Sequence, residues 1–315
     1  MTRARGAATA TAAATRSGIT FRKATTADLP ACTAIWRDAL NDYMGRLNLP
    51  EIPPENASIG RLHAHLLATD PDGFVVAERD GRPIGFTSSV RRGDLWFLSM
   101  LFVRPGEQGA GLGRALLAEL LPADGAALAT ATDSAQPISN ALYATYGIVP
   151  RVPLLNFVGR PMPGARVPSL PAGVTATRLD PSTAATAAEL DAVDADVVGF
   201  VRPADHGFLV GEGRVAFAYR SRAGETLGYG YTSEAGRVGP VAVRDESLLP
   251  AVLGHILTAV VPRGASALWV AGSAGRAVVA LLELGLRLDG FPVLLCWDRP
   301  IVDFERYLPI SPGLL

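Results

Sequence analysis

LFVRPGEQGAGLGRALL, residues 101–117, leads from an apolar strand through a glycine-rich loop into a helix. The strand is predicted over 95–103, and the helix opens near Gly113. Such a loop aims several backbone N–H groups at one point, where the helix dipole also favours an anion. Gly109, Gly111 and Gly113 have no Cβ, so a phosphate can approach the main chain closely. We call residues 104–113 the glycine loop and interpret it as a cradle for a pyrophosphate.

Other kinds of loop also contain clustered glycines. A Walker loop requires Gly-Lys-Ser/Thr, and no lysine follows these glycines. A dinucleotide fingerprint requires a third glycine at position 114, where this chain has Arg114, and its glycines follow the strand directly. The spacing to Asp133 does imitate the ribose-binding acid of that fingerprint, so this interpretation stays open. A mobile glycine loop without a ligand is the remaining alternative.

The sequence of the loop resembles that of a loop in a known family. Val103-x-Pro105-x-x-Gln108-x-x-Gly111-x-Gly113 is similar to the coenzyme A loop of the GNAT N-acetyltransferase superfamily, whose pattern is Arg/Gln-x-x-Gly-x-Gly/Ala. The resemblance implies acetyl-CoA as the co-substrate and no metal. It also implies that the pyrophosphate is held by Gln108, Gly109, Ala110, Gly111, Leu112, Gly113 and Arg114.

Length and charge restrict the class of protein. A chain of 315 residues is comfortable for two domains of ordinary size. Its 49% hydrophobic and 19% charged residues describe a soluble globular protein. The net charge of −1 suggests neither a nucleic acid nor an acidic surface as a partner. We expect a monomer or a homodimer.

Cysteine content and apolar runs bear on compartment. Cys32 and Cys296 are too few for a disulfide framework or a zinc site, and both fall among apolar residues expected in the core. No apolar run reaches the length of a membrane span, so no membrane partner is expected. Residues 1–17 are rich in Ala and Thr, lack the apolar region of a signal peptide, and predict a disordered tail. A cytoplasmic protein is expected.

Strands and helices alternate over the first half of the chain. Periodicity predicts strands at 19–23, 74–78, 84–90, 95–103, 126–132 and 154–158, and helices at 28–43, 57–68, 114–121 and 139–146. By itself this indicates an α/β unit with a central sheet. The order matches the GNAT architecture over 18–160. The resemblance implies a mixed sheet that splays apart after its fourth strand, with the acyl thioester in the opening.

The pattern begins again after a proline-rich linker, 161–173. Strands are predicted at 174–178, 214–219, 226–232, 238–243 and 267–271, and helices at 184–197, 249–261 and 276–284. Two segments, GIVPRVPLLNFVGRP (147–161) and GLRLDGFPVLLCWDRP (285–300), are similar, with one inserted residue.

These observations predict an α/β fold of two tandem GNAT-like domains, each a mixed, splayed central sheet flanked by helices. The expected boundaries are a tail at 1–17, an N-terminal domain at 18–160, the linker at 161–173 and a C-terminal domain at 174–315. In place of the glycines the second copy has VRDESLLPAVL from Val243. It is therefore expected to have lost coenzyme A binding.

Acyl transfer to an amine needs a polarised thioester carbonyl and a proton for the leaving thiolate. In the resembled family a backbone N–H at the splayed fourth strand contacts that carbonyl, and here the strand ends at Leu101, Phe102 and Val103. The family's general acid is usually a Tyr four residues before the Gly that ends the last helix. Tyr143 stands at that spacing, and Asn140 is placed with it as a coenzyme contact. The alternative is that Tyr143 is an ordinary packing aromatic.

The general base departs from the family pattern. Many members carry a Glu on the fourth strand, but 95–103 contains no carboxylate. Ser99 is a candidate to order a water, and with Tyr143 and Asp133 it forms the expected catalytic set. The candidates for the base itself are Glu78, Asp133, His63 and His65, each of which also has an ordinary structural explanation. A base is unnecessary where the amine has a low pKa or loses its proton to bulk water.

The acceptor is expected to lie against the first two helices, so Trp36, Tyr43 and His63 are candidates to line its site. Trp36 and Tyr43 are seven residues apart and fit a core face equally well. In the second half, Arg202, Asp205 and His206 form a polar cluster that either completes a pocket or belongs to a capped loop. The segment 306–315 is apolar and is expected to pack down.

The sequence thus predicts an acyl-CoA-dependent N-acyltransferase. Acetyl is the expected acyl group, and the acceptor is an amine of a small molecule or a peptide that attacks directly in a ternary complex. A non-catalytic acyl-CoA-binding or scaffold protein is the first alternative, motivated by the missing carboxylate and the degenerate second copy. An NAD(P)-linked oxidoreductase is the second, disfavoured by Arg114.

Overall fold

The computed structural model describes residues 18–54, 56–180 and 183–315, so the predicted tail at 1–17 lies outside the described residues. The described residues separate into two compact units, one ending at Leu128 and the other running from Ala129 to Leu315, which are described one at a time. The boundary between them falls within strand β5 (Ala127–Asp133).

The first unit is built on an antiparallel sheet with the strand order β1-β2-β3-β4. Its strands are β1 (Ile19–Lys23), β2 (Phe74–Arg79), β3 (Arg82–Arg92) and β4 (Leu95–Val103). The β3–β4 ladder is interrupted at one point, where Ser88 pairs with Met100 but Ser89 pairs with Leu98. Ser99 is therefore an extra residue, a β-bulge of the kind that bends a strand and often lies beside a functional site.

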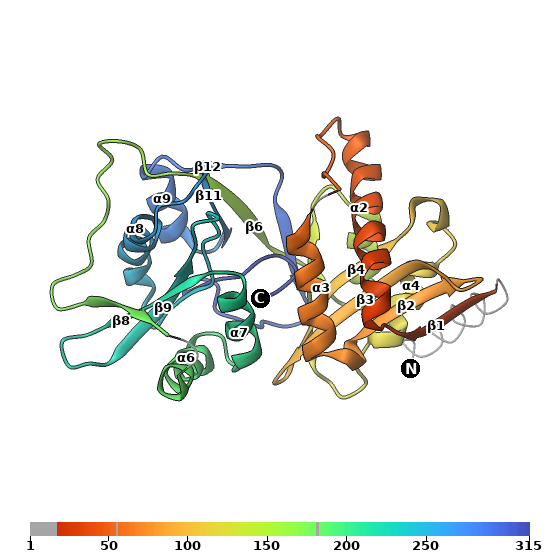
Figure 1. Cartoon of the computed structure of the whole chain (residues 1–315), viewed down its shortest axis with the longest axis horizontal. Coiled ribbons are helices and arrows are strands. Elements are labelled where there is room, and N and C mark those ends of the chain that lie inside the picture. The colour runs from red at the N-terminus through yellow and green to blue at the C-terminus, as the bar shows by residue number, and fades with distance from the viewer. Residues whose placement is uncertain (1–17, 55, 181–182) are drawn as a thin grey trace. The chain divides into compact units, whose positions relative to one another are not determined.

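Helices cover both faces of this sheet. They are α2 (Leu29–Arg46), α3 (Ala57–Thr69) and α4 (Leu112–Leu120), with short 3-10 turns η1 (Thr26–Asp28), η2 (Pro71–Gly73) and η3 (Pro105–Glu107). Side chains alternate along a strand. Val75 accordingly packs with Leu112 and Leu116 of α4, whereas the neighbouring Phe74 meets the ring of His63 on α3. Helices α2 and α3 lie side by side on the face opposite α4 (Figure 1).

In the second unit, strand β13 lies between β5 and β6, and β6 continues to β11. The strands are β6 (Val149–Gly159), β11 (Ser266–Ala271), β12 (Arg287–Leu288), which also pairs with β6, and β13 (Val293–Trp297). Val293 pairs with Asp133 on one side and Leu154 on the other. Leu154 in turn pairs with Ala271. Strands from both copies therefore alternate across this sheet.

The alternation is an exchange of the two similar segments 147–161 and 285–300. Aligning Pro153 with Pro292 makes Leu154 the counterpart of Val293, and these two residues pair directly in the antiparallel ladder. Each closing strand then lies beside the fifth strand of the other copy, β13 beside β5 and β6 beside β11. The similarity seen in the sequence is thus a local pseudo-twofold symmetry around the Leu154–Val293 pair.

A second antiparallel sheet of this unit has the order β14-β10-β9-β8-β7. Its strands are β7 (Thr175–Leu179), β8 (Val215–Arg220), β9 (Thr226–Thr232), β10 (Val241–Val243) and β14 (Tyr307–Leu308). The helices are α5 (Pro137–Ala144), α6 (Ala184–Val197), α7 (Pro203–Gly211), α8 (Leu249–Ala259) and α9 (Gly275–Glu283), with a 3-10 turn η4 (Glu246–Leu248). The adjacent helices α8 and α9 contribute Val252, Ile256 and Leu281 to the buried core (Figure 1).

Most predicted elements form within a few residues of their expected ends, but β6 begins at Val149 rather than near Leu154, and β12 was not predicted. Two further regions also differ. The capped-loop interpretation of 202–206 is wrong, because Arg202 is the N-cap of helix α7 and Pro203 is its first residue. Gly207 and Gly211 interrupt the apolar periodicity of this helix, which hides it in the sequence. Residues 306–315 pack down as predicted, and Tyr307–Leu308 within them form β14, which was not predicted from the sequence.

No helix among residues 18–54, 56–180 and 183–315 combines the length and the apolar character needed to cross a membrane.

Candidate functional site

The glycine loop is open where the sequence analysis expected a pyrophosphate. Gly109 and Gly111 have φ values of +88° and +82°, in the left-handed region that glycine adopts at little cost. A Cβ added to either residue would meet nothing within 4 Å. Both residues are exposed, and α4 begins at Leu112, directly after Gly111. The loop therefore leaves its main chain accessible to a ligand.

Helix α4 adds a favourable field at the same place. The first N–H groups of an α-helix have no partner inside the helix, and the dipole places partial positive charge at that end. Because Gly111 is the N-cap residue of α4, these donors follow the open glycines without an intervening residue. Open main chain and a helix N-terminus together fit an anion such as a pyrophosphate.

The base of the glycine loop is tied to the sheet and to α2. The Gln108 side chain donates from Nε2 to the carbonyl of Val103 at 3.0 Å, so it anchors the loop to the end of β4. Glu107 accepts from Arg79 of β2 at 2.7 Å. Arg104 pairs with Asp38 of α2 at 3.3 Å. Each of these half-exposed pairs contributes little stability, but together they restrict where the loop begins.

The side chains at the end of β4 alternate between the two faces of the sheet. Leu101 and Val103 pack toward α4, whereas Phe102 stacks on Phe86 with ring centroids 5.7 Å apart. Ser99 is buried at the bulge, and so is Ser88, whose hydroxyl has no hydrogen-bond partner among the described residues. The water-ordering role expected of Ser99 would thus have to be exercised from inside the sheet.

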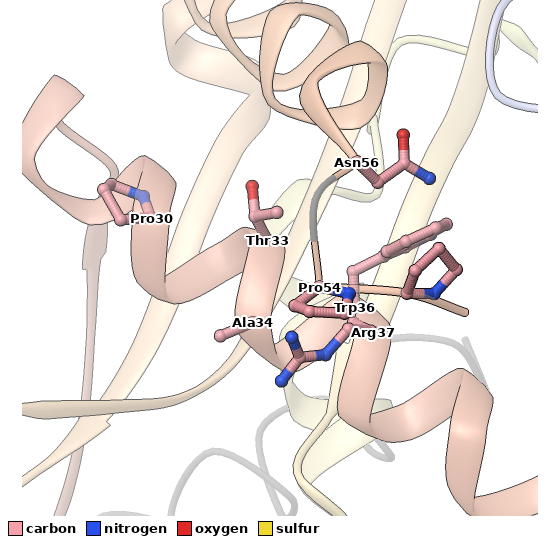
Figure 2. Close-up of a pocket in the computed structure, with 8 residues that line it drawn as sticks. Pro30, Thr33, Ala34, Trp36, Arg37, Pro54 and Asn56 are labelled. Atoms are coloured by element: carbon pink, nitrogen blue, oxygen red, sulfur yellow. The ribbon is translucent and has the colours of Figure 1, made fainter. Parts of the chain in front are cut away.

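A cavity of about 150 Å³ lies between α2 and the segment that leads into α3. Figure 2 shows Trp36 extending toward the proline-rich segment, and Thr33 one turn earlier on α2. The lining residues are Pro30, Thr33, Ala34, Trp36, Arg37, Pro53, Pro54 and Asn56. Of the three residues expected to line an acceptor site, Trp36 lines this cavity, whereas Tyr43 and His63 do not. Thr33 and Arg37 were missed, although both lie within a helical turn of Trp36.

His63 is a core residue, with its side chain fully buried. Its Nε2 atom lies 3.1 Å from the Met100 sulfur, and its Nδ1 atom lies 3.1 Å from the Thr33 hydroxyl. Burial lowers the pKa of His63 to about 4, so the ring is neutral near neutral pH. His63 does not line the cavity itself, but it is hydrogen-bonded to Thr33, which does.

In the second unit, β5 and α5 bring together three residues of the predicted site. Asn140 donates from Nδ2 to the carbonyl of Asp133 at 3.1 Å, and its buried Oδ1 has no partner within the described ranges. Tyr143 is buried one turn later on α5. Burial raises the pKa of the Tyr143 hydroxyl and the nearby Cys296 thiol raises it further, so this group keeps its proton.

The other candidate bases lie in different settings. Glu78 accepts from Arg22 at 2.9 Å, and Arg22 also binds Asp28, so Glu78 belongs to a structural ion-pair group. His65 is half-buried on α3. In the part of the chain that the structure describes, no three His, Cys, Asp or Glu side chains gather as a metal site would require.

Both cysteines are buried and free, as the sequence predicted. Burial raises the pKa of Cys32 and of Cys296 to about 12. A thiol that stays protonated is a poor nucleophile, so neither residue is suited to carry an acyl group.

Comparison with known proteins identifies a family that part of the chain matches. Residues 34–148 match the family model described as Acetyltransferase (GNAT) family. No curated protein matches the sequence significantly.

Solved structures resemble the whole chain at low sequence identity. A putative acetyltransferase from Pyrococcus horikoshii aligns with a TM-score of 0.72 and 16% identity over 95% of this chain and 96% of its own. A GCN5-related N-acetyltransferase from Sphaerobacter thermophilus gives 0.59 and 18% over 90% and 97%. A tandem GNAT protein from the clavulanic acid biosynthesis pathway gives 0.57 and 17% over 90% and 99%. At such low identities these structural alignments show the fold alone, and they confirm the predicted fold of two tandem GNAT-like domains.

Proposed function

Because residues 34–148 match the model of the acetyltransferase (GNAT) family, we propose that this chain transfers an acyl group, acetyl in the first instance, from coenzyme A to an amine. The observation that carries the proposal is the open glycine loop that leads into α4. Gly109 and Gly111 leave space for a phosphate at the main chain, and the N-terminus of α4, whose dipole favours an anion, follows them directly. The residues that follow the glycines do not fit a Walker loop or a dinucleotide-binding loop.

The chain's part in the reaction is to bind, orient and supply a proton, because coenzyme A brings the activated thioester. In this proposal the loop from Gln108 to Arg114 binds the pyrophosphate. A backbone N–H at the end of β4, in the stretch 101–103, polarises the thioester carbonyl. Tyr143 holds the proton that the departing thiolate needs, and burial keeps that hydroxyl protonated. Asn140 offers its unpaired Oδ1 to the coenzyme.

We place the amine in the cavity on α2. Trp36 and the two prolines offer an apolar wall, and Thr33 and Asn56 offer polar atoms. None of the described lining residues is a carboxylate, and His63 is a weak base in its buried position. We therefore propose that the amine loses its proton to water rather than to a dedicated side chain. The structural and buried settings of Glu78 and Ser99 agree with this assignment.

Calorimetric titration with acetyl-CoA tests the coenzyme part of the proposal. We expect one equivalent to bind, because the second copy has no glycines in the corresponding loop. Release of free thiol in the presence of a panel of small amines and peptides then tests transfer. Binding without turnover of any amine supports the alternative, a non-catalytic acyl-CoA-binding protein, which the absence of a carboxylate on β4 favours. An absence of binding rejects both.

Tyr143→Phe tests the proton donor. Loss of general acid catalysis typically lowers a rate by 10²- to 10⁴-fold, so we expect kcat to fall by about 100-fold with acetyl-CoA affinity unchanged. Tyr146→Phe is the matched control, since Tyr146 is also buried and lies three residues away. Equal kcat values in the two variants would remove Tyr143 from the mechanism.

A further inference from the structure

A segment late in the chain completes the second sheet by adding β14 to the edge of β10. Leu308 pairs with Val241, and Tyr307 pairs with Ala242. The N–H of Val243 donates to the carbonyl of Arg306 at 3.0 Å. We call residues 303–315 the closing segment.

The edge that receives β14 has a counterpart in the first copy. Val243-Arg244 in the second copy corresponds to Val103-Arg104 in the first, where the fourth strand ends in each. Strand β10 is thus the counterpart of 101–103, the backbone to which the proposed function assigns the thioester. In the second copy the equivalent backbone is paired with the chain itself.

Arg202 attaches the closing segment at two further points. Its Nη1 group donates to the backbone oxygen of Leu315 at 2.6 Å and also to the Tyr307 hydroxyl. The guanidinium carbon lies 4.9 Å from the centre of the Tyr307 ring. Arg202 is 1% exposed, although it is an arginine outside the regular part of a helix. A buried arginine is tolerated only where its charge and its donors are matched.

The opposite side of Arg202 is matched by Asp194 of α6, which is fully buried. Asp194 accepts from Arg202 Nε at 3.0 Å and from the Tyr229 hydroxyl at 2.5 Å. It also lies 2.9 Å from His206 Nε2, which donates to it because a carboxylate can only accept. The closing segment therefore covers a charged centre whose remaining donors point at that segment.

We infer that the closing segment is a resident peptide ligand of the second copy, bound as an added strand on β10 and locked by Arg202. It lies where the proposed function, on which this inference rests, places the acyl arm of the coenzyme in the first copy. The second copy then fails to bind acetyl-CoA for two reasons: its loop has no glycines, and its strand edge is taken.

Hydrogen exchange on the full chain, followed by mass spectrometry, tests the lock. In the wild type we expect peptides within 303–315 to be protected. In Arg202→Met we expect them to exchange at least 100-fold faster, a larger increase than in peptides from β13. Arg263→Met is the matched control, because Arg263 makes a solvent-exposed pair with Glu234. That variant is expected to exchange as the wild type does.

Tyr307→Phe guards against a variant that unfolds. It removes one acceptor of Arg202 and keeps the ring, so we expect about tenfold faster exchange confined to the closing segment. Wild-type rates in that segment for both Arg202→Met and Tyr307→Phe overturn the lock, as does an unprotected segment in the wild type. Binding of two equivalents of acetyl-CoA overturns the inference that the closing segment occupies the coenzyme position of the second copy. An absence of acetyl-CoA binding overturns the proposed function, and the exchange rates still decide the lock.

Discussion

Gly111→Trp is expected to lower the affinity for acetyl-CoA by at least 100-fold, about 2.7 kcal/mol of binding free energy. Gly111 has a φ of +82°, where a residue with a Cβ costs about 1–2 kcal/mol, and its missing side chain leaves open space at the main chain. An indole there fills the volume assigned to a phosphate and pulls the N-cap of α4 out of its conformation. Calorimetric titration gives the affinity directly.

Gly81→Trp is the control for backbone strain in this experiment. Gly81 lies in the turn between β2 and β3, has a φ of +73°, and also has nothing within 4 Å of an added Cβ. The two substitutions therefore introduce the same side chain into similar backbone conformations of the same unit. We expect Gly81→Trp to bind acetyl-CoA as the wild type does. Wild-type affinity in Gly111→Trp would show that the phosphate lies elsewhere.

Asp194→Asn is expected to destabilise the second unit by about 3–5 kcal/mol, because removing one partner of a buried ion pair leaves the other charge unmatched. Asp194 has no exposed surface and accepts from Arg202, Tyr229 and His206. An amide in its place offers one oxygen instead of two and turns a donor toward the other donors. Urea unfolding followed by fluorescence measures the loss as a lower midpoint.

Asp196→Asn is the matched control on the same helix. Asp196 lies two residues after Asp194, is about half-exposed, and pairs with Arg244 at the surface. Exposed pairs contribute about 0–1 kcal/mol, so we expect at most a small change. Equal destabilisation by the two substitutions would mean that the helix, rather than the buried charge, determines the effect.

The effect of Asp194→Asn on stability is also expected to depend on pH. Burial by itself raises the pKa of Asp194, but attraction to Arg202 and the hydrogen bonds from His206 and Arg202 outweigh it and lower the pKa. A group with a lowered folded-state pKa stabilises the fold above its unfolded pKa, about 3.9, and loses that contribution as the pH falls through the folded value. We therefore expect the stability difference between wild type and Asp194→Asn to shrink below about pH 4.

The candidate coenzyme site was predictable from sequence because its determinants are local. Gly109 and Gly111 need only the absence of a Cβ and a helix that starts immediately afterwards, and both conditions are written in consecutive residues. The helix Ala184–Val197 and the strand Leu95–Val103 were likewise predicted from the sequence at their observed ends. The similarity of 147–161 and 285–300 predicts the repeat.

Other features depended on which distant segments pack together. The periodicity of β13 shows which of its side chains share a face but not which strand lies beside it, so the exchange with β6 came only from the tertiary structure. His63 lies on a helix whose pattern does not distinguish a core imidazole from a pocket imidazole.

Arg202 is the clearest case of a residue whose environment is not local. Its partners stand 8, 27, 105 and 113 residues away in the sequence. Backbone conformation is selected by neighbours along the chain, whereas burial of a charge is selected by partners that only folding brings within hydrogen-bond distance.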